Sequence, residues 1–506
     1  MPTLNNYFYK STICLGFISV LLGAAPVQAQ NCNAPYEMMT ELRYPELGSY
    51  SVWDNAYGEP RKSEIFKSAI ALDDGTVLAV GEKRHLEKVA PSLMIVKFDK
   101  RGRKSWEEYH SPGQIKDIVK FIPFQKGYVI LVNRYAKDEN RKDYASLFFI
   151  DNNAKITKVQ NIQSDAYNIT ATDVLGLNDA ADTIVISAIH SRSEGQGEDQ
   201  RSIKRGAIYT YNKNKNATNW REYIVGINSE ILSLEKTLIK GGAIDIIATG
   251  TFENNHGKKM GWVFRLDKDG SYKWQKEFSR GESTLVSDAY GYKNGDIIAA
   301  GTVKPIGERP NGAWLMRLDG NNGDIKWQRY YYGEKSQYHY SAQDVVVNDD
   351  GIITFLMSAI SYNEIEERGF DGSGFGHVLN ISPRGITLGG EAYFKGNSAH
   401  INEMRLAPKS QYIMSGYTWQ NAQKVFEEFK EGKDKNNPTP VLPEAEISQK
   451  SQKGLDLLKG KVEADHVIKD RLNSDNNALK KNGKEQDQNA WVMIGTAFDT
   501  YTDPCD

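Results

Sequence analysis

The sequence has few cysteines and almost no net charge. Only three cysteines occur in 506 residues, and 63 basic residues nearly balance 65 acidic ones. A chain without a basic excess lacks the electrostatic footprint of a nucleic-acid-binding protein. We therefore expect no nucleic-acid partner.

Long apolar runs are also lacking, apart from one near the N-terminus. Residues 1–29 hold a single charge, Lys10, followed by an apolar run from Thr12 to Ala25 and then by Val27-Gln28-Ala29. The run is shorter than the roughly 20 residues that span a bilayer, and the last three residues suit a signal peptidase. We expect a secretory signal peptide that is cleaved after Ala29, with an N-terminal membrane anchor as the alternative. The mature protein would have no integral membrane segment and would be periplasmic, at the cell surface or secreted.

Cleavage would leave two cysteines, Cys32 and Cys505, at opposite ends of the chain. Two thiols in an oxidising compartment most often pair. We predict a Cys32–Cys505 disulfide. Free or intermolecular thiols are the alternative, because the sequence alone does not place the two Cα atoms within the ~4.4–6.8 Å that a bridge requires.

Motifs for local catalytic or metal chemistry are missing. No His-Glu-x-x-His occurs, and the glycine-dense segment Gly369–Gly376 places Ser373 between two expected strands, not at the strand-to-helix turn of a nucleophile elbow. The acidic clusters at Asp267–Gly270 and Asp319–Asp324 lack the rest of a calcium-binding loop and are interpreted as turns. No two of the eight histidines are close enough to suggest a metal pair: His85, His110, His190, His256, His339, His377, His400 and His466. We predict no catalytic, metal-binding or cofactor-binding residues and no cofactor.

What the sequence does contain is a repeat, clearest in Asp296–Gly333. Three apolar runs in this segment are separated by Gly, Asn, Asp and Pro, a pattern typical of consecutive antiparallel strands. The first of these runs, which we assign to a second strand, recurs at spacings of about 50 to 63 residues: Val77–Gly81, Tyr128–Asn133, Thr183–Ala188, Ile246–Gly250, Ile297–Gly301, Ile352–Met357 and Tyr412–Gly416. A third-strand run follows each: Leu93–Asp99, Ala145–Asp151, Ala207–Asn212, Trp262–Asp267, Trp314–Asp319, His377–Ile381 and Trp491–Gly495. A fourth strand begins near a tryptophan in four repeats, at Trp106, Trp220, Trp274 and Trp327.

Four short strands repeated seven times predict an all-β, seven-bladed propeller of four-stranded antiparallel blades. Six or eight blades are the alternatives. The last repeat lacks a fourth strand, and Ser49–Gly58 resembles Lys326–Gly333, so an N-terminal strand at 49–58 would complete the last blade and close the ring. Residues 49–506 would then form the propeller, preceded by an N-terminal segment at 30–48.

One segment does not fit a blade. Residues 421–488 interrupt the last repeat and hold 13 basic and 13 acidic residues. Apolar residues recur among the charges of its second half, which indicates an amphipathic helix in this charged insertion: Leu455, Leu458, Val462, Ile468 and Leu472. A solvated helix on one rim is the main interpretation, and a partner-binding or membrane-binding helix is the alternative.

The phrases Gly-Ala-Trp-Leu-Met-Arg-Leu-Asp at 312–319 and Asp-Gly-Ser-Tyr-Lys-Trp at 269–274 carry a family resemblance. They resemble the repeats of exported bacterial β-propeller proteins, similar in blade pattern to quinoprotein-like and WD-type propellers. The resemblance implies the fold and no activity. Quinoprotein blades carry Ala, Asp and Thr-Gly before the tryptophan, whereas only Gly323 and Trp327 agree here, so we expect no quinone cofactor.

These observations favour an exported, monomeric binding scaffold for a protein or glycan partner. Recognition would use long polar loops and aromatic residues on the blades. Two alternatives stay open: a hydrolase or lyase acting on glycans or phosphoesters at the propeller axis, and a lectin-like sugar binder. The loops are Glu82–Pro91, Arg192–Arg205, Val303–Asn311 and Glu364–Arg368, and the aromatics are Tyr330–Tyr332, Tyr338–Tyr340, Tyr417 and Trp419.

Overall fold

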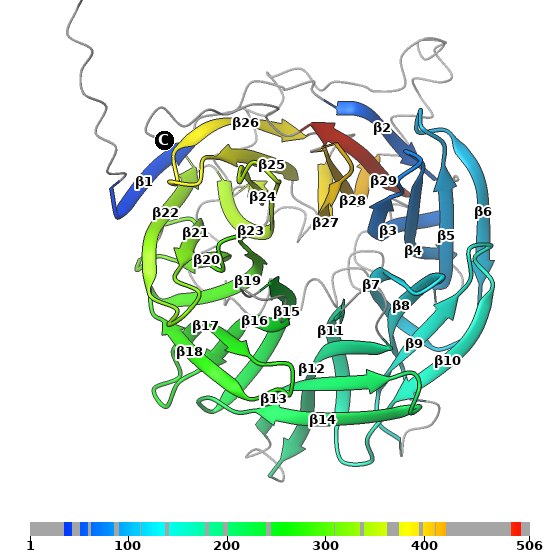
Figure 1. The fold of residues 1–506 in the computed structure, drawn as a ribbon, viewed down its shortest axis with the longest axis horizontal. Helices are drawn as coiled ribbons and strands as arrows, with labels where there is room; N and C mark the ends of the chain where they lie inside the picture. The colour runs from blue at the N-terminus through cyan, green and yellow to red at the C-terminus, as the bar shows by residue number, and fades with distance from the viewer. Residues whose placement is uncertain are drawn as a thin grey trace, which may run out of the picture.

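The computed structural model is a ring of seven β-sheets around a central axis (Figure 1). It describes residues 35–496 apart from 43–50, 59–61, 86–90, 112, 137–140, 178–181, 196–200, 239–243, 308, 334–337, 362–373, 394–397, 410 and 421–486. Each sheet contains a blade of four antiparallel strands, which confirms the predicted seven-bladed propeller, and one sheet has a fifth strand in addition. The described residues form no helix, and hence none that could cross a membrane.

Each blade runs outward from an innermost strand beside the axis (Figure 1). The innermost strands are β3 (Lys62–Ala71), β7 (Ile115–Phe124), β11 (Asn168–Gly176), β15 (Asn228–Leu238), β19 (Ser283–Gly291), β23 (Tyr338–Val347) and β27 (Ser398–Ala407). The second strands are β4 (Val77–His85), β8 (Gly127–Arg134), β12 (Thr183–Glu194), β16 (Ile244–Glu253), β20 (Ile297–Lys304), β24 (Ile353–Ser361) and β28 (Gln411–Gln420). The third strands are β5 (Ser92–Phe98), β9 (Tyr144–Ile150), β13 (Arg201–Asn212), β17 (Lys259–Leu266), β21 (Gly312–Leu318), β25 (Gly374–Ile381) and β29 (Asp487–Thr496). The outer strands are β6 (Lys104–His110), β10 (Ile156–Ile162), β14 (Ala217–Tyr223), β18 (Tyr272–Phe278), β22 (Ile325–Gly333), β26 (Thr387–Tyr393) and, in the seventh blade, β2 (Ser51–Tyr57).

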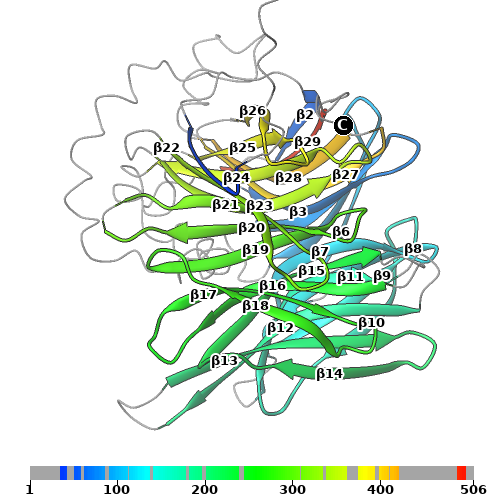
Figure 2. The same cartoon turned by 60° about the vertical axis from the view of Figure 1, so that its left-hand side comes forward.

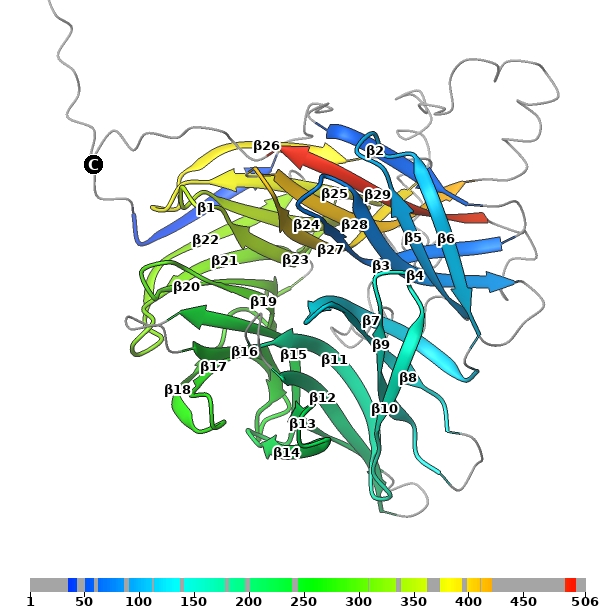
Figure 3. The same ribbon diagram turned by 45° about the vertical axis from the view of Figure 1, so that its right-hand side comes forward.

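The ring closes where the two ends of the propeller meet. β2 pairs antiparallel with β29, so a strand from the start of the chain is the outer strand of the seventh blade (Figure 3). Phe66 and Ala79 of the first blade pack with Ile413 and Val492 of the seventh in one hydrophobic cluster. Neighbouring blades elsewhere in the described structure enclose equivalent clusters, so buried apolar side chains hold the whole ring together.

Every innermost strand carries a β-bulge against its second strand. In the first blade the bulge lies opposite Gly81, where a Cβ would stand 1.9 Å from the Ile65 carbonyl oxygen. In the seventh blade it lies opposite Gly416, with the same 1.9 Å clearance to the His400 carbonyl oxygen. The bulged backbone therefore leaves no room for a side chain, which explains why several second-strand runs end in glycine.

The Trp and Arg of the repeat phrases join blades five and six on the outside of the ring. The Asp296 carboxylate binds Arg317, with 2.8 Å from Arg317 Nε to Asp296 Oδ2. Arg317 Nη1 and Trp327 Nε1 both donate to the Pro383 carbonyl of blade six, at 2.8 and 3.1 Å. Blades four and five repeat this arrangement with Asp245, Arg265, Trp274 and the Gly320 carbonyl.

A fifth strand was not expected from the sequence. β1 (Glu37–Leu42) pairs in parallel with the outer strand β22 of blade five (Figure 2). The Gln328 N–H donates to the Tyr36 carbonyl at 2.8 Å, and the buried Arg329 guanidinium donates to the Pro35 carbonyl at 3.0 Å. Part of the N-terminal segment predicted at 30–48 thus belongs to the propeller.

Two expected loops are partly strand. β12 and β13 stay paired out to Glu194 and Arg201, so most of the polar segment Arg192–Arg205 is an extended hairpin. Gly374 and Gly376 of the expected loop Gly369–Gly376 belong to β25, where a Cβ on Gly376 would stand 2.0 Å from Ile401 Cδ1 of the next blade. β29 begins at Asp487, inside the predicted limits of the charged insertion. The signal peptide, Cys32, Cys505, Glu364–Arg368 and the helical part of the insertion lie outside the described residues.

Candidate functional site

Polar side chains meet at the propeller axis, one from each innermost strand. They occupy the position that follows each bulge, and we call them the axial ring: Ser68, Lys120, Asp173, Ser233, Asp288, Asp344 and Glu403. The bulge interrupts the alternation of the strand and directs these side chains toward the neighbouring blade.

The axial ring connects each blade to the next. Asp173 accepts a hydrogen bond from the Leu234 N–H at 2.8 Å, and Asp344 accepts one from the Met404 N–H at 2.7 Å. Hydrogen bonds or ion pairs also connect the blades at the other junctions. An ion pair joins Lys120 to Asp173. The hydrogen bonds run from the Phe121 N–H to Ser68, from Ser233 to Asp288, from the Val345 N–H to Asp288, and from the bulged Asn402 to the Phe66 carbonyl. Most polar groups of the axial ring are therefore used in holding blades together.

Asp288 and Asp344 form a carboxyl pair within this ring. A hydrogen bond joins their side chains, which requires a proton on one of them. Burial raises the pKa of Asp344 well above its ordinary value, and the negative charges of Asp288 and Glu403 add to this effect. The Ser233 hydroxyl and the Val345 N–H both donate to Asp288, so Asp288 is the better placed to stay ionised.

Glu235 stands beside the axial ring without a partner. In the described part of the chain its carboxyl makes no hydrogen bond or ion pair, and the residue is partly exposed. Burial raises the pKa of Glu235 to about 8, against the attraction of Lys120 and with the repulsion of Asp288 and Asp173. Glu235 is thus a carboxyl group that is protonated near neutral pH.

A second carboxyl pair lies where blades one and two meet. Lys67 Nζ is 2.9 Å from Asp117 Oδ1 and 3.8 Å from Glu82 Oε1. Burial opposes ionisation of Glu82, but Lys67 and Arg84 hold its pKa at about 2. Burial raises the pKa of Asp117 to about 7, with Lys67 opposing the shift and Glu82 adding to it. The ionised Glu82 also accepts the Ile118 N–H at 3.0 Å, so this pair is another blade junction.

The acidic turns and His190, which the sequence singles out, have ordinary structural surroundings. Asp267 Oδ1 accepts the N–H groups of Asp269 and Ser271 at 2.9 Å, and Asp319 Oδ1 accepts that of Asn321, which confirms that both clusters are turns. His190 lies between Glu222 and Tyr209. Within the described ranges no group of three or more His, Cys, Asp or Glu side chains is placed to bind a metal.

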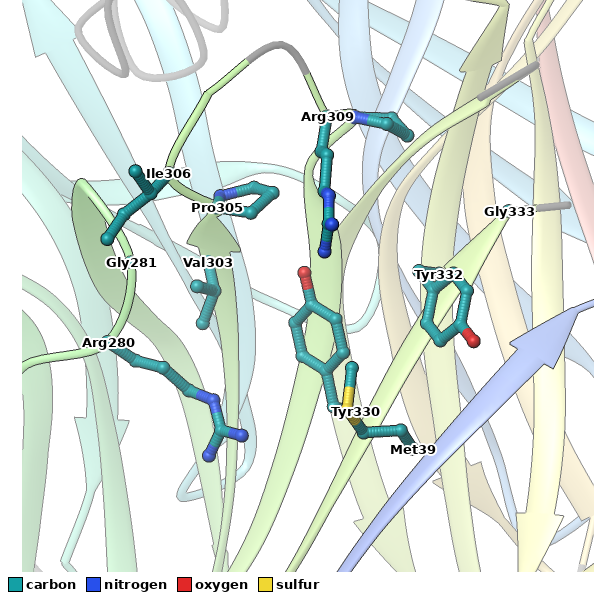
Figure 4. A pocket seen from close by; sticks show the side chains of 11 residues that line it. Met39, Arg280, Gly281, Val303, Pro305, Ile306, Arg309, Tyr330, Tyr332 and Gly333 are labelled. Carbon is teal, nitrogen blue, oxygen red and sulfur yellow. The ribbon is translucent and has the colours of Figure 1, made fainter. Parts of the chain in front are cut away.

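A pocket lies far from the axis, at the outer edge of blade five (Figure 4). Its volume is about 600 Å³, within the usual range for small-molecule sites. Tyr330 and Tyr332 stack on one side with ring centroids 6.0 Å apart, and Tyr330 lies over Gly312, where a Cβ would be 2.3 Å from the ring. The complete lining is Met39, Arg280, Gly281, Val303, Pro305, Ile306, Arg309, Pro310, Tyr330, Tyr332 and Gly333.

A polar network fixes the wall that β1 contributes to this pocket. Arg280 forms an ion pair with Glu37 of β1 and donates to Gln328 Oε1 at 2.9 Å. Trp314 Nε1 donates to the same oxygen at 3.0 Å, and Gln328 Nε2 lies 3.4 Å from Glu37. Docking of β1 and the position of Arg280 are therefore linked.

Sequence reasoning found part of this site. The pocket takes Tyr330 and Tyr332 from the aromatic segment Tyr330–Tyr332. It takes five residues from the loop Val303–Asn311: Val303, Pro305, Ile306, Arg309 and Pro310. Tyr331 instead is fully buried in the core between blades five and six. The axial ring was missed, although the innermost strands share a signal: a polar residue one place beyond each bulge and followed by an apolar one, as in Asp173-Val174, Asp288-Ala289, Asp344-Val345 and Glu403-Met404.

The sequence matches no described protein family and no curated protein. Among solved structures, the chain is similar to an α-L-arabinofuranosidase from Fusarium graminearum in complex with an iminosugar inhibitor, at 10% identity over 66% of this chain and 98% of that one, with a TM-score of 0.41. It is also similar to the β-propeller domain of the Trilobed protease from Pyrococcus furiosus, at 10% identity over 73% and 91%, with a TM-score of 0.38. The acylaminoacyl peptidase of Pyrococcus horikoshii matches at 13% identity over 72% of this chain and 49% of that chain, with a TM-score of 0.38. Likenesses this distant say nothing about activity.

Proposed function

We propose that this protein is an exported β-propeller that binds a ligand in the pocket at the edge of blade five and does no chemistry at its axis. The observation that carries the proposal is a contrast between the axial ring and the pocket. Axial ring groups are engaged by the neighbouring blade, as Asp173 and Asp344 are by backbone N–H groups. The pocket offers an open apolar cavity instead, with polar groups at its edge.

Rigid walls support a binding role. Three paired strands contribute to the pocket: β20 with Val303, β22 with Tyr330 and Tyr332, and β1 with Met39. β1 is fixed by Glu37 and Arg329. Binding to a site that is already formed loses less conformational entropy than binding to a flexible one. A propeller that presents such a pocket on one blade suits a scaffold or a ligand-binding module.

A hydrolase or lyase at the axis is the second candidate, and Glu235 is the observation that favours it. An unpartnered carboxyl with a pKa of about 8 has the properties of a general acid at neutral pH. Its neighbour Lys120 and the Asp288–Asp344 pair would then surround the reacting group.

One experiment separates the two candidates. The purified mature protein is exposed to a fragment library of neutral, anionic and cationic compounds while hydrogen exchange is followed, and it is assayed in parallel on chromogenic glycosides and phosphoesters. The proposal expects ligand-dependent protection of residues 303–312 and 328–333 and no turnover. Turnover that disappears in Glu235→Gln, or the absence of any fragment that protects the pocket, would overturn it.

A further inference from the structure

The pocket on blade five offers a hydroxyl donor to a ligand. Tyr330 is 7% exposed, and its hydroxyl makes no hydrogen bond with any described residue. Figure 4 shows this hydroxyl pointing toward the Arg309 guanidinium at the mouth of the pocket. The hydroxyl is accessible from the pocket, so a ligand that accepts a hydrogen bond can reach it.

Arg309 supplies a positive charge at the same point. Its guanidinium forms no ion pair or hydrogen bond within the described ranges. The other arginine of the pocket, Arg280, is already bound to Glu37 and Gln328. The eleven lining residues include no acid that could neutralise Arg309. The positive charge of Arg309 therefore favours an anionic ligand in this pocket.

The remaining walls are apolar, and two of their side chains are unusually exposed. Ile306 is 78% exposed and Met39 is 58% exposed, although both are large apolar side chains that line the cavity. Val303, Pro305 and the Tyr332 ring continue the same surface. Covering such side chains removes apolar area from water, which contributes roughly 25 cal/mol per Å². The body of the ligand should accordingly be apolar or aromatic.

We infer that this pocket binds a small amphiphilic anion, with a carboxylate or phosphate held by Arg309 and Tyr330 and an apolar or aromatic body packed between Ile306, Met39 and Tyr332. The inference rests on the proposed binding function and names its ligand class. β1 is part of the site, because Met39 closes the wall that faces Tyr330 (Figure 4).

Three probes of equal size test this ligand class on the mature protein: naphthylacetate, its neutral amide naphthylacetamide, and naphthylethylammonium. We expect the carboxylate to bind at least about tenfold more tightly than the amide, because only the carboxylate carries a negative charge that pairs with the Arg309 guanidinium. The ammonium should bind most weakly of the three. Hydrogen exchange identifies the site by protection of residues 328–333.

Two variants and two matched controls make the test specific. Tyr330→Phe and Arg309→Gln should each reduce the preference for the carboxylate over the amide to about threefold or less, with unchanged thermal stability. Tyr331→Phe removes the neighbouring buried hydroxyl, which faces Thr387 Oγ1 at 3.3 Å, and Arg101→Gln removes an exposed arginine on blade one. Both controls should keep the preference of the wild-type protein.

The outcomes separate this inference from the proposed function. Protection of the pocket by the amide or the ammonium as strong as that by the carboxylate would overturn the anion inference and leave a binding role in place. A carboxylate preference that survives in both Tyr330→Phe and Arg309→Gln would also overturn it. Failure of all three probes to protect the pocket would contradict the inference, and failure of the whole fragment library would contradict the proposed function as well.

Discussion

Asp288 of blade five and Asp344 of blade six share a hydrogen bond at the propeller axis, so one of these two acids keeps its proton in the folded protein. Each also accepts a backbone N–H from the next blade, Asp288 from Val345 at 3.0 Å and Asp344 from Met404 at 2.7 Å. The pair is therefore a link between three successive blades. Its behaviour can be tested by substitutions that keep or remove the proton donor.

Asp344→Asn should preserve this link. The asparagine amide can donate to Asp288 as the protonated acid does, and its carbonyl can accept the Met404 N–H. We expect a loss of less than about 1 kcal/mol in the unfolding free energy at pH 7, against about 1–3 kcal/mol for Asp344→Ala, which leaves a buried N–H unpaired. Denaturant unfolding measures both. Equal losses in the two variants would show that Asp344 is not the proton donor.

Glu235→Gln should make the protein more stable at alkaline pH. The pKa of Glu235 is raised from about 4.5 in the unfolded chain to about 8 in the folded one. Its favourable contribution is therefore complete below pH 4.5 and is lost as the pH rises through 8, because the folded protein must then ionise a buried acid.

Glutamine does not titrate, so this pH dependence should disappear in the variant. Taking the stability difference between variant and wild type near pH 4 as the reference, we expect the variant to gain on the order of 2 kcal/mol by pH 9, a value already reduced for the solvent screening of a partly exposed group. Thermal unfolding across this pH range gives the comparison. Parallel curves for the two proteins would mean that Glu235 titrates normally.

Gly81→Ala tests the tight contact at the bulge of the first blade. The new Cβ would meet the Ile65 carbonyl oxygen at 1.9 Å, so the backbone must shift, at about 1–3 kcal/mol or more. The control is Ala188→Gly, at the equivalent register in blade three, where an alanine already fits opposite Ala171. We expect about 1 kcal/mol or less for the control. Similar losses in both variants would argue against crowding as the cause.

The Cys32–Cys505 disulfide stays a prediction, since both cysteines lie outside the described residues. A non-reducing peptide map of the mature protein should contain the linked peptide pair. Reduction should lower the unfolding free energy by about 2–5 kcal/mol. Rapid alkylation of both thiols in unreduced protein would contradict the bridge.

The blades were predictable because their strands carry local signals. The apolar runs that end in Gly81 or Gly416 indicate a second strand. Their glycine also indicates the bulge on the facing strand, since a side chain at either position would clash with the bulged backbone. The Trp and Arg of the repeat phrases bind the next blade: Arg317 and Trp327 both donate hydrogen bonds to the Pro383 carbonyl. These features involve only one repeat and the next one along the chain, so the sequence pattern of each repeat is enough to predict them.

The axial ring and the pocket depend on residues that are far apart in the sequence. Ser233 and Asp288 meet only when two repeats pack around the axis, and a lone Ser or Asp within a strand gives no sign of this. β1 pairs with β22 across almost 300 residues, and Arg329 stabilises the pairing by donating to the Pro35 carbonyl. Nothing in the sequence distinguishes Arg329 from the other arginines of the chain. Sequence patterns of period two identify strands and leave open which distant strand will pair with them.

β1 and β2 are neighbours in the chain but belong to different blades: β1 is bonded to β22 of blade five, and β2 to β29 of blade seven. A pulling force on the N-terminus would therefore reach β1 first and load its parallel pairing with β22, while the β2–β29 seam that closes the ring carries no load. The seam would be stretched only after β1 has come away. Under tension applied at the N-terminus, the first event would be the separation of β1 from β22, which opens the pocket wall while all seven blades stay closed.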